Sequence, residues 1–223
     1  MAGFIELILA LVVFLGSHGV AGAFGLRAKL VGALGERPYL ILYSLVSLAL
    51  LVWLFSAALR APYVEVWPPV PGAAHLLLTL MPIACVLWAS ALVEPNPFSL
   101  GVRQSGFDPA RPGMVAPVRH PLFFGMVLWA GGHLLANGDL AGILLFAPML
   151  LLSLFGPKIA RRKAEARLGG PEAYAALEAE MKEAPLFRRF PGWKVYVAAA
   201  VLYAVLISLH GPVVGIYPKQ MLG

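Results

Sequence analysis

Six long apolar stretches constrain the fold of this chain more than any other feature of its sequence. About 20 apolar residues in a helix are needed to cross the roughly 30 Å of hydrocarbon in a bilayer. The chain has 223 residues, of which 60% are hydrophobic and only 13% are charged, which leaves little material for a soluble domain. We therefore predict an all-α, polytopic membrane helix bundle of about six transmembrane helices, forming a single integral membrane domain over residues 1–223. The predicted spans are Phe4 to Ala23, Tyr39 to Leu59, His75 to Val93, Pro121 to Ala136, Leu140 to Pro157 and Val195 to about Val213.

The basic residues between these stretches predict the orientation of the chain. Of the 17 Lys and Arg residues, only Arg60 and Lys219 lie on the side of the predicted bundle that holds the two termini. Because loops rich in Lys and Arg stay in the cytoplasm, we expect both termini to face the periplasm of a bacterial inner membrane. We expect a helical cytoplasmic element over about 158–193, in which Gly169, Gly170 and Pro171 end one helix and begin another.

Charge and cysteine content narrow the classes of partner. The net charge is +6, but the basic residues flank apolar stretches, where they meet anionic lipid headgroups rather than nucleic acid. Cys85 is the only cysteine, so the chain has no intramolecular disulfide. Met1 to Gly3 lack the basic residues of a secretory signal, and Glu6 follows them, so we expect the first helix to be retained.

Histidines inside the predicted spans are the main functional candidates, because polar side chains in a bilayer are costly. His18, His133 and His210 lie within spans, whereas His75 and His120 lie nearer helix ends. His18 stands in a run of small residues, from Gly16 to Gly25, which allows another helix or a flat ligand to approach the backbone closely. The alternative is that this run serves helix packing alone.

His133 belongs to a stripe of residues spaced four apart on one helix face. The two glycines before it cost roughly 1 kcal/mol each in helix propensity relative to alanine, which a purely structural helix would not favour. The stripe therefore indicates a closely packed ligand. Its members are Pro121, Gly125, Trp129, His133 and Asn137.

Two histidines could act as axial ligands of a haem. By helical rise, His18 lies roughly 14 Å from the cytoplasmic edge, His133 about 21 Å and His210 about 24 Å. Depth therefore favours His210 as the partner of His133. However, side chains lean toward the N-terminus of their own helix, which narrows the gap between His18 and His133 on oppositely directed helices. Zinc is disfavoured, since no cysteine or carboxylate stands near enough to complete its ligand set.

The tripeptide Arg119-His120-Pro121 opens the fourth predicted span. Pro121 suits the first turn of a helix, and the two residues before it could hold an anionic group near the helix N-terminus. An equally good interpretation is a basic anchor followed by an N-terminal proline.

These motifs together resemble the NnrU family of membrane proteins, over most of the chain to about Phe187. The resemblance rests on Gly16-Ser17-His18, Gly35-Glu36-Arg37, Arg119-His120-Pro121 with Gly125, and Trp129 through His133 to Asn137-Gly138-Asp139. The family is associated with nitrite and nitric oxide respiration and includes the 15-cis-zeta-carotene isomerase, which holds haem b. The resemblance implies His18 and His133 as axial ligands of the iron. Ala130 occupies the position of a cysteine implicated in ligand change in the plant isomerase.

A second similarity is to membrane methyltransferases related to isoprenylcysteine carboxyl methyltransferase. It begins at Arg119-His120-Pro121 and continues through Arg162, Glu165, Gly170 and Tyr174, although Lys163 and Ala164 interrupt the paired-glutamate pattern. This resemblance implies S-adenosylmethionine as cofactor, bound near Arg119, His120 and Glu165.

Three functional hypotheses follow from the sequence. The first is a haem b protein, acting either as a cis-trans isomerase of a polyene or as an accessory protein of nitrite and nitric oxide respiration. The second is a methyltransferase that uses S-adenosylmethionine and acts on a lipophilic substrate. The third is a membrane assembly protein without catalytic activity, whose histidines only stabilise the bundle.

Overall fold

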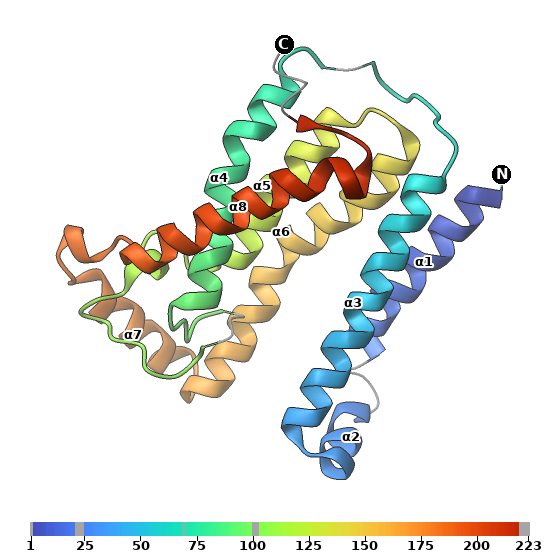
Figure 1. The fold of residues 1–223 in the computed structure, drawn as a ribbon. Coiled ribbons are helices and arrows are strands. Elements are labelled where there is room, and N and C mark those ends of the chain that lie inside the picture. The colour runs from blue at the N-terminus through green and yellow to red at the C-terminus, as the bar shows by residue number, and fades with distance from the viewer. Residues whose placement is uncertain (1, 21–24, 69, 100–102, 219–223) are drawn as a thin grey trace. The chain divides into compact units, whose positions relative to one another are not determined.

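The computed structural model describes residues 2–20, 25–68, 70–99 and 103–218, and this part of the chain is helical apart from loops and one isolated β-bridge (Figure 1). Within the described residues, all six apolar stretches form helices. The helices are α1 (Ala2–Val20), α2 (Leu26–Leu34), α3 (Glu36–Arg60), α4 (Ala73–Val93), α5 (Pro121–Ala136), α6 (Leu140–Leu168), α7 (Pro171–Lys182) and α8 (Trp193–Val214). Two short 3-10 turns cover Gly113–Val115 and Leu186–Arg188.

Four of these helices, α3, α4, α6 and α8, are long and apolar enough to cross a membrane. Helices α1 and α5 are apolar but shorter. The membrane character of the chain is thus confirmed, while the count of six spans and the orientation of the termini stay predictions. Two parts of those predictions, Ala21–Ala23 and Lys219, lie outside the described residues.

By its internal contacts the chain divides into two units, and the prediction of a single membrane domain stays untested. Unit 1 comprises residues 1–68 and 137–145. In it, α1 packs along α3 (Figure 1). The Glu6 carboxylate lies 2.6 Å from the Arg60 guanidinium and accepts a hydrogen bond from the Trp53 indole at 3.2 Å. Because both partners of Glu6 come from α3, this polar cluster joins the two helices at one end.

A backbone contact in unit 1 fixes the turn between α5 and α6. The backbone N–H groups of Val66 and Trp67 donate to the Gly138 carbonyl at 2.8 and 3.1 Å. A side chain at Gly138 would overlap the Trp67 carbonyl, so this close approach requires glycine. Residues 137–139 therefore form a tight turn, held by the chain that follows α3.

Unit 2 comprises residues 69–136 and 146–223, and α4 packs against both α5 and α8 in it. Small residues allow the close approach of α4 and α8: Cys85 and Ala89 of α4 form a buried cluster with Val195 and Ala199 of α8. The buried centre of this contact therefore consists of small and medium-sized side chains, while Val197 and Val201 on the other face of α8 are exposed.

A second buried cluster of unit 2 lies away from the contact between α4 and α8. It consists of Phe98, Val115, Ala164, Tyr174 and Met181, contributed by the proline-rich loop between α4 and α5 (residues 94–120), the end of α6, and α7. The predicted helical element is present, because α6 continues to Leu168 and α7 begins at Pro171 after two glycines with φ of +100° and +125°. The loop is irregular, but it is packed against these helices.

Candidate functional site

His133 of α5 lies among aromatic rings of unit 2. Its ring centroid is 5.4 Å from that of Trp129, one helical turn earlier, and 4.9 Å from that of Phe146 on α6. The ring of His210, on α8, lies 6.3 Å away with an interplanar angle of 25°. Two imidazoles therefore face each other within unit 2, and an aromatic ring packs against one of them.

The hydrogen bonds of His18, His133 and His210 indicate which ring nitrogen carries the proton. Nδ1 of His133 lies 2.8 Å from the Trp129 carbonyl, and Nδ1 of His18 lies 2.8 Å from the Phe14 carbonyl, each four residues earlier. Nδ1 of His210 lies 2.7 Å from the Ile216 carbonyl. A carbonyl oxygen only accepts, so Nδ1 donates in each neutral imidazole and the lone pair falls on Nε2. Histidines that ligate metals are oriented in the same way.

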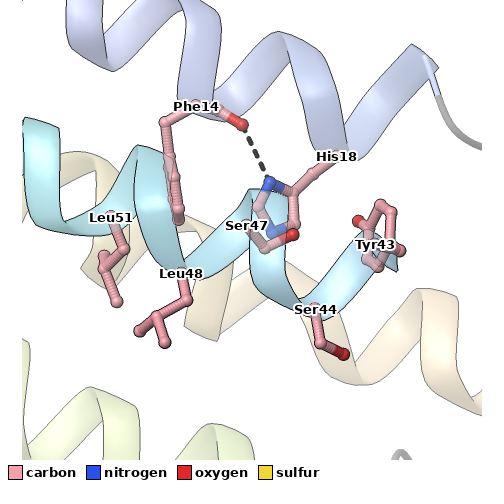
Figure 2. Close-up of a pocket in the computed structure, with 7 residues that line it drawn as sticks. All are labelled: Phe14, His18, Tyr43, Ser44, Ser47, Leu48 and Leu51. Atoms are coloured by element: carbon pink, nitrogen blue, oxygen red, sulfur yellow. Dashed lines mark hydrogen bonds between the residues drawn. The ribbon is translucent and has the colours of Figure 1, made fainter. Parts of the chain in front are cut away.

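His18 of α1 lines a hollow of about 350 Å³ in unit 1 (Figure 2). Its ring centroid lies 4.6 Å from that of Phe14 and 6.0 Å from that of Tyr43 on α3. The Ser44 and Ser47 hydroxyls from α3 also line the hollow. A Cβ built at Gly16 or Gly19 meets no atom within 4 Å in the described part of unit 1, so no close contact requires glycine at either position.

The other residues of the predicted stripe differ in their surroundings. Trp129 packs edge-on against Phe146, with ring centroids 5.3 Å apart. A Cβ at Gly125 would lie 2.6 Å from the indole nitrogen of Trp88 on α4. The space beside Gly125, which the sequence suggested for a ligand, is therefore filled by the Trp88 indole.

Arg119 is held by several partners at the start of α5. Its guanidinium donates to the Glu178 carboxylate of α7 at 2.8 Å and to the carbonyls of Val115 and Ala116 at 2.9 and 2.6 Å. It also lies over the Phe98 ring, 5.8 Å from the centroid. Because most of its donors are used within the protein, Arg119 acts as a clamp between the loop and α7.

His120 lies beside a hollow of about 400 Å³ that α5 and α6 line together with the end of the loop. Its Nδ1 is 2.9 Å from the Ser99 hydroxyl. Burial, followed by the positive charges of Arg119 and Arg161, lowers the pKa of His120, so the ring is neutral at pH 7. His120 therefore has no positive charge with which to help Arg119 bind an anion.

The residues of the methyltransferase resemblance also have partners within the protein. Glu165 accepts a hydrogen bond from Arg161 at 2.7 Å, and the same guanidinium lies 5.1 Å from the centroid of the Tyr174 ring. No observation on these residues favours a cofactor over their packing role.

Sequence reasoning did not pair Phe146 with His133, nor Glu178 with Arg119. Phe146 lies in an unbroken apolar run, where no periodicity distinguishes it. The spacing of residues on α7 could have identified Glu178. Tyr174, Glu178 and Lys182 are spaced four apart on this helix, and the ring of Tyr174 is buried. The face of α7 that packs inward therefore carries Glu178 with it.

The predicted ligand pair divides between the two units, with His18 in unit 1 and His133 in unit 2. Their pairing stays a prediction. Among the described residues, no group of three or more His, Cys, Asp or Glu side chains is suited to a metal ion. An iron bound in a porphyrin needs only two axial ligands from the protein.

Comparison with known proteins gives one match. The family model described as NnrU protein matches residues 6–218, nearly the whole chain. No curated protein and no solved structure matches the chain.

Proposed function

Because the chain belongs to the NnrU family, we propose that it is an integral membrane protein of the bacterial inner membrane that binds haem b through His133 and His18. The observation that carries this proposal is the bond from Nδ1 of each histidine to the carbonyl four residues earlier. In the neutral ring this bond places the lone pair on Nε2, the atom that would bind the iron, and it holds the ring against rotation. His210 is the alternative second ligand, since its Nδ1 is engaged in the same way.

The donor set and the surroundings fit a haem. The residues offer imidazoles and aromatic rings, which suit a flat apolar macrocycle, and His18 lines a hollow of about 350 Å³ in unit 1. When bound, the haem would supply an iron centre with two imidazole ligands, suited to electron transfer or to exchange of one ligand. The protein would orient the rings and exclude water.

Of the two roles considered for such a haem, we place the accessory role in nitrite and nitric oxide respiration before isomerisation of a polyene. Ala130, at the position of the cysteine in the plant isomerase, is fully buried and carries no thiol. A change of axial ligand through a thiolate at that position is therefore excluded in this chain.

The test is the optical spectrum of the detergent-purified chain, with variants of each histidine. We expect a Soret band, a pyridine haemochrome of b type and the low-spin spectrum of two imidazole ligands. His133→Ala and His18→Ala should each lose the low-spin spectrum, and added imidazole should restore it. His75→Ala is the matched control, because His75 is exposed at the start of α4 and should leave the spectrum unchanged.

The variants also separate the alternatives. If His210→Ala abolishes the low-spin spectrum and His18→Ala does not, His210 is the second ligand. A colourless protein that stays colourless after incubation with haem would exclude the haem proposal. Retention of S-adenosylmethionine by that colourless protein would favour the methyltransferase.

A further inference from the structure

The segment Leu186–Lys194, which runs from the 3-10 turn after α7 into the first turn of α8, carries an exposed group of large apolar side chains. Leu186, Phe187, Phe190 and Trp193 are exposed by 70%, 74%, 59% and 71%. Four such side chains within eight residues are too many to leave in water without a partner. Something must cover this segment, which we name the aromatic-basic segment.

The segment is fixed rather than loosely attached. The Arg189 guanidinium donates to the carbonyls of Ala184 and Lys182, and a 3-10 turn begins at Leu186. The Gly192 N–H donates to the Glu94 carboxylate at 3.2 Å. The fold therefore presents the exposed rings in a defined place.

The helix that follows, α8, indicates what covers the aromatic-basic segment. Trp193, Val197, Val201 and Val205 stand four apart on α8 and are exposed by 71%, 53%, 59% and 45%. The opposite face of α8 is buried through Val195 and Ala199. Because α8 is long and apolar enough to cross a membrane, its outward stripe faces lipid. Trp193 is the first residue of that stripe, so the rings just before it reach the same lipid at the level of the headgroups.

The charge of the segment identifies the kind of lipid. Arg188, Arg189 and Lys194 alternate with the apolar side chains, and residues 185–194 contain no acidic residue. The Arg188 guanidinium lies over the Phe187 ring, 5.6 Å from its centroid, so charge and ring are presented together. Aromatic rings favour the interface of a bilayer, and neighbouring basic side chains bind anionic headgroups.

We propose that the aromatic-basic segment is a docking site for anionic phospholipid, with Phe187, Phe190 and Trp193 in the interface and Arg188 and Lys194 on the phosphates. The site anchors the end of α7 to the membrane surface. Through Glu178 of α7, it also steadies Arg119 at the start of α5.

The first test measures the depth of Trp193 in the bilayer. The full chain is placed in nanodiscs of phosphatidylcholine and phosphatidylglycerol that contain nitroxide lipids, labelled either near the glycerol or at the chain end. The difference in fluorescence between the wild-type protein and Trp193→Phe gives the signal of Trp193. This signal should be quenched more by the label near the glycerol than by the label at the chain end. Equal quenching by both labels, or none, would overturn the proposal, as would a detergent-resistant dimer that disappears in Trp193→Phe, because a second copy would then cover the segment.

The second test measures charge recognition. Phosphatidylglycerol added in detergent should raise the thermal unfolding midpoint at lower concentration than phosphatidylcholine. In the double variant Arg188→Gln/Lys194→Gln, the phosphatidylglycerol concentration that gives half of this rise in the midpoint should increase roughly twenty-five-fold, about five-fold for each basic residue. Arg162→Gln/Lys163→Gln is the matched control, since it removes equal charge from an exposed part of α6 and should change the concentration little. An unchanged concentration in the first variant, or an equal rise in the control, would contradict the proposal.

Discussion

At the scale of single residues, the roles of polar side chains follow from which atoms are already engaged. Arg119 was a candidate for holding an anion, but its guanidinium donates to Glu178 and to two carbonyls. In His18 and His133, a backbone carbonyl accepts the hydrogen bond from Nδ1, so the lone pair of the neutral ring lies on Nε2. Arg119 and the two histidines all stand out in the sequence, but Arg119 is a structural clamp, whereas the histidines are candidate ligands.

The Arg119–Glu178 pair leads to a prediction about stability. The side chains are only 20% and 27% exposed, so Glu178→Gln should lower the free energy of unfolding by about 1–3 kcal/mol at pH 7. Glu36→Gln is the control: its pair with Arg27 is 3.5 Å long and mostly exposed, so its loss should cost about 0.5 kcal/mol or less. Thermal unfolding followed by tryptophan fluorescence measures both.

The same pair should depend on pH in a defined direction. The hydrogen bond from Arg119 is the main cause that lowers the pKa of Glu178 below its ordinary value of 4.5. A lowered carboxyl pKa gives stability that is complete above 4.5 and is lost as the pH falls through the folded-state pKa. Wild-type protein and Glu178→Gln should therefore differ at pH 7 and converge in acid. A constant difference across this range would contradict the assignment.

At the scale of elements, glycines show which helix faces are closely packed and which are open. A Cβ at Gly156 of α6 would overlap the Phe123 ring of α5. At Gly131 of α5 it would meet only the Leu150 side chain, at an ordinary 3.9 Å. Two glycines in apolar helices therefore have opposite reasons for their presence, and the hydropathy of the sequence does not distinguish them.

This contrast predicts opposite effects of the same substitution. Gly156→Ala should destabilise the protein by about 1–3 kcal/mol, because a rigid ring or the helix backbone must move. Gly131→Ala should stabilise it by up to about 1 kcal/mol through helix propensity. The midpoint of thermal unfolding can be followed by the reactivity of the Cys85 thiol, which is fully buried in the folded protein. Two midpoint shifts of the same sign would show that α5 and α6 do not pack in this way.

At the scale of the whole molecule, the distribution of basic residues predicts the topology. Fusions of alkaline phosphatase to the C-terminus should be active, and green fluorescent protein inserted between Gly169 and Gly170 should fluoresce, because the basic connections stay in the cytoplasm. Reciprocal fusions at the same two places serve as controls. A fluorescent C-terminal fusion would place that end in the cytoplasm and contradict an even number of spans with both ends outside.

The sequence by itself determined the membrane class, the positions of the apolar helices, the break at Gly169-Gly170 and the histidines inside the apolar helices. These features depend on local composition and periodicity, which a single chain displays directly. Only the tertiary structure decided that Trp88 fills the space at Gly125, that Glu178 pairs with Arg119 and that Phe146 packs against His133. Depth along the helices already favoured His210 as the partner of His133, and the two rings lie 6.3 Å apart. Such contacts join residues distant in sequence, and in an apolar helix every face has nearly the same hydropathy, so the pattern alone does not select the packed face.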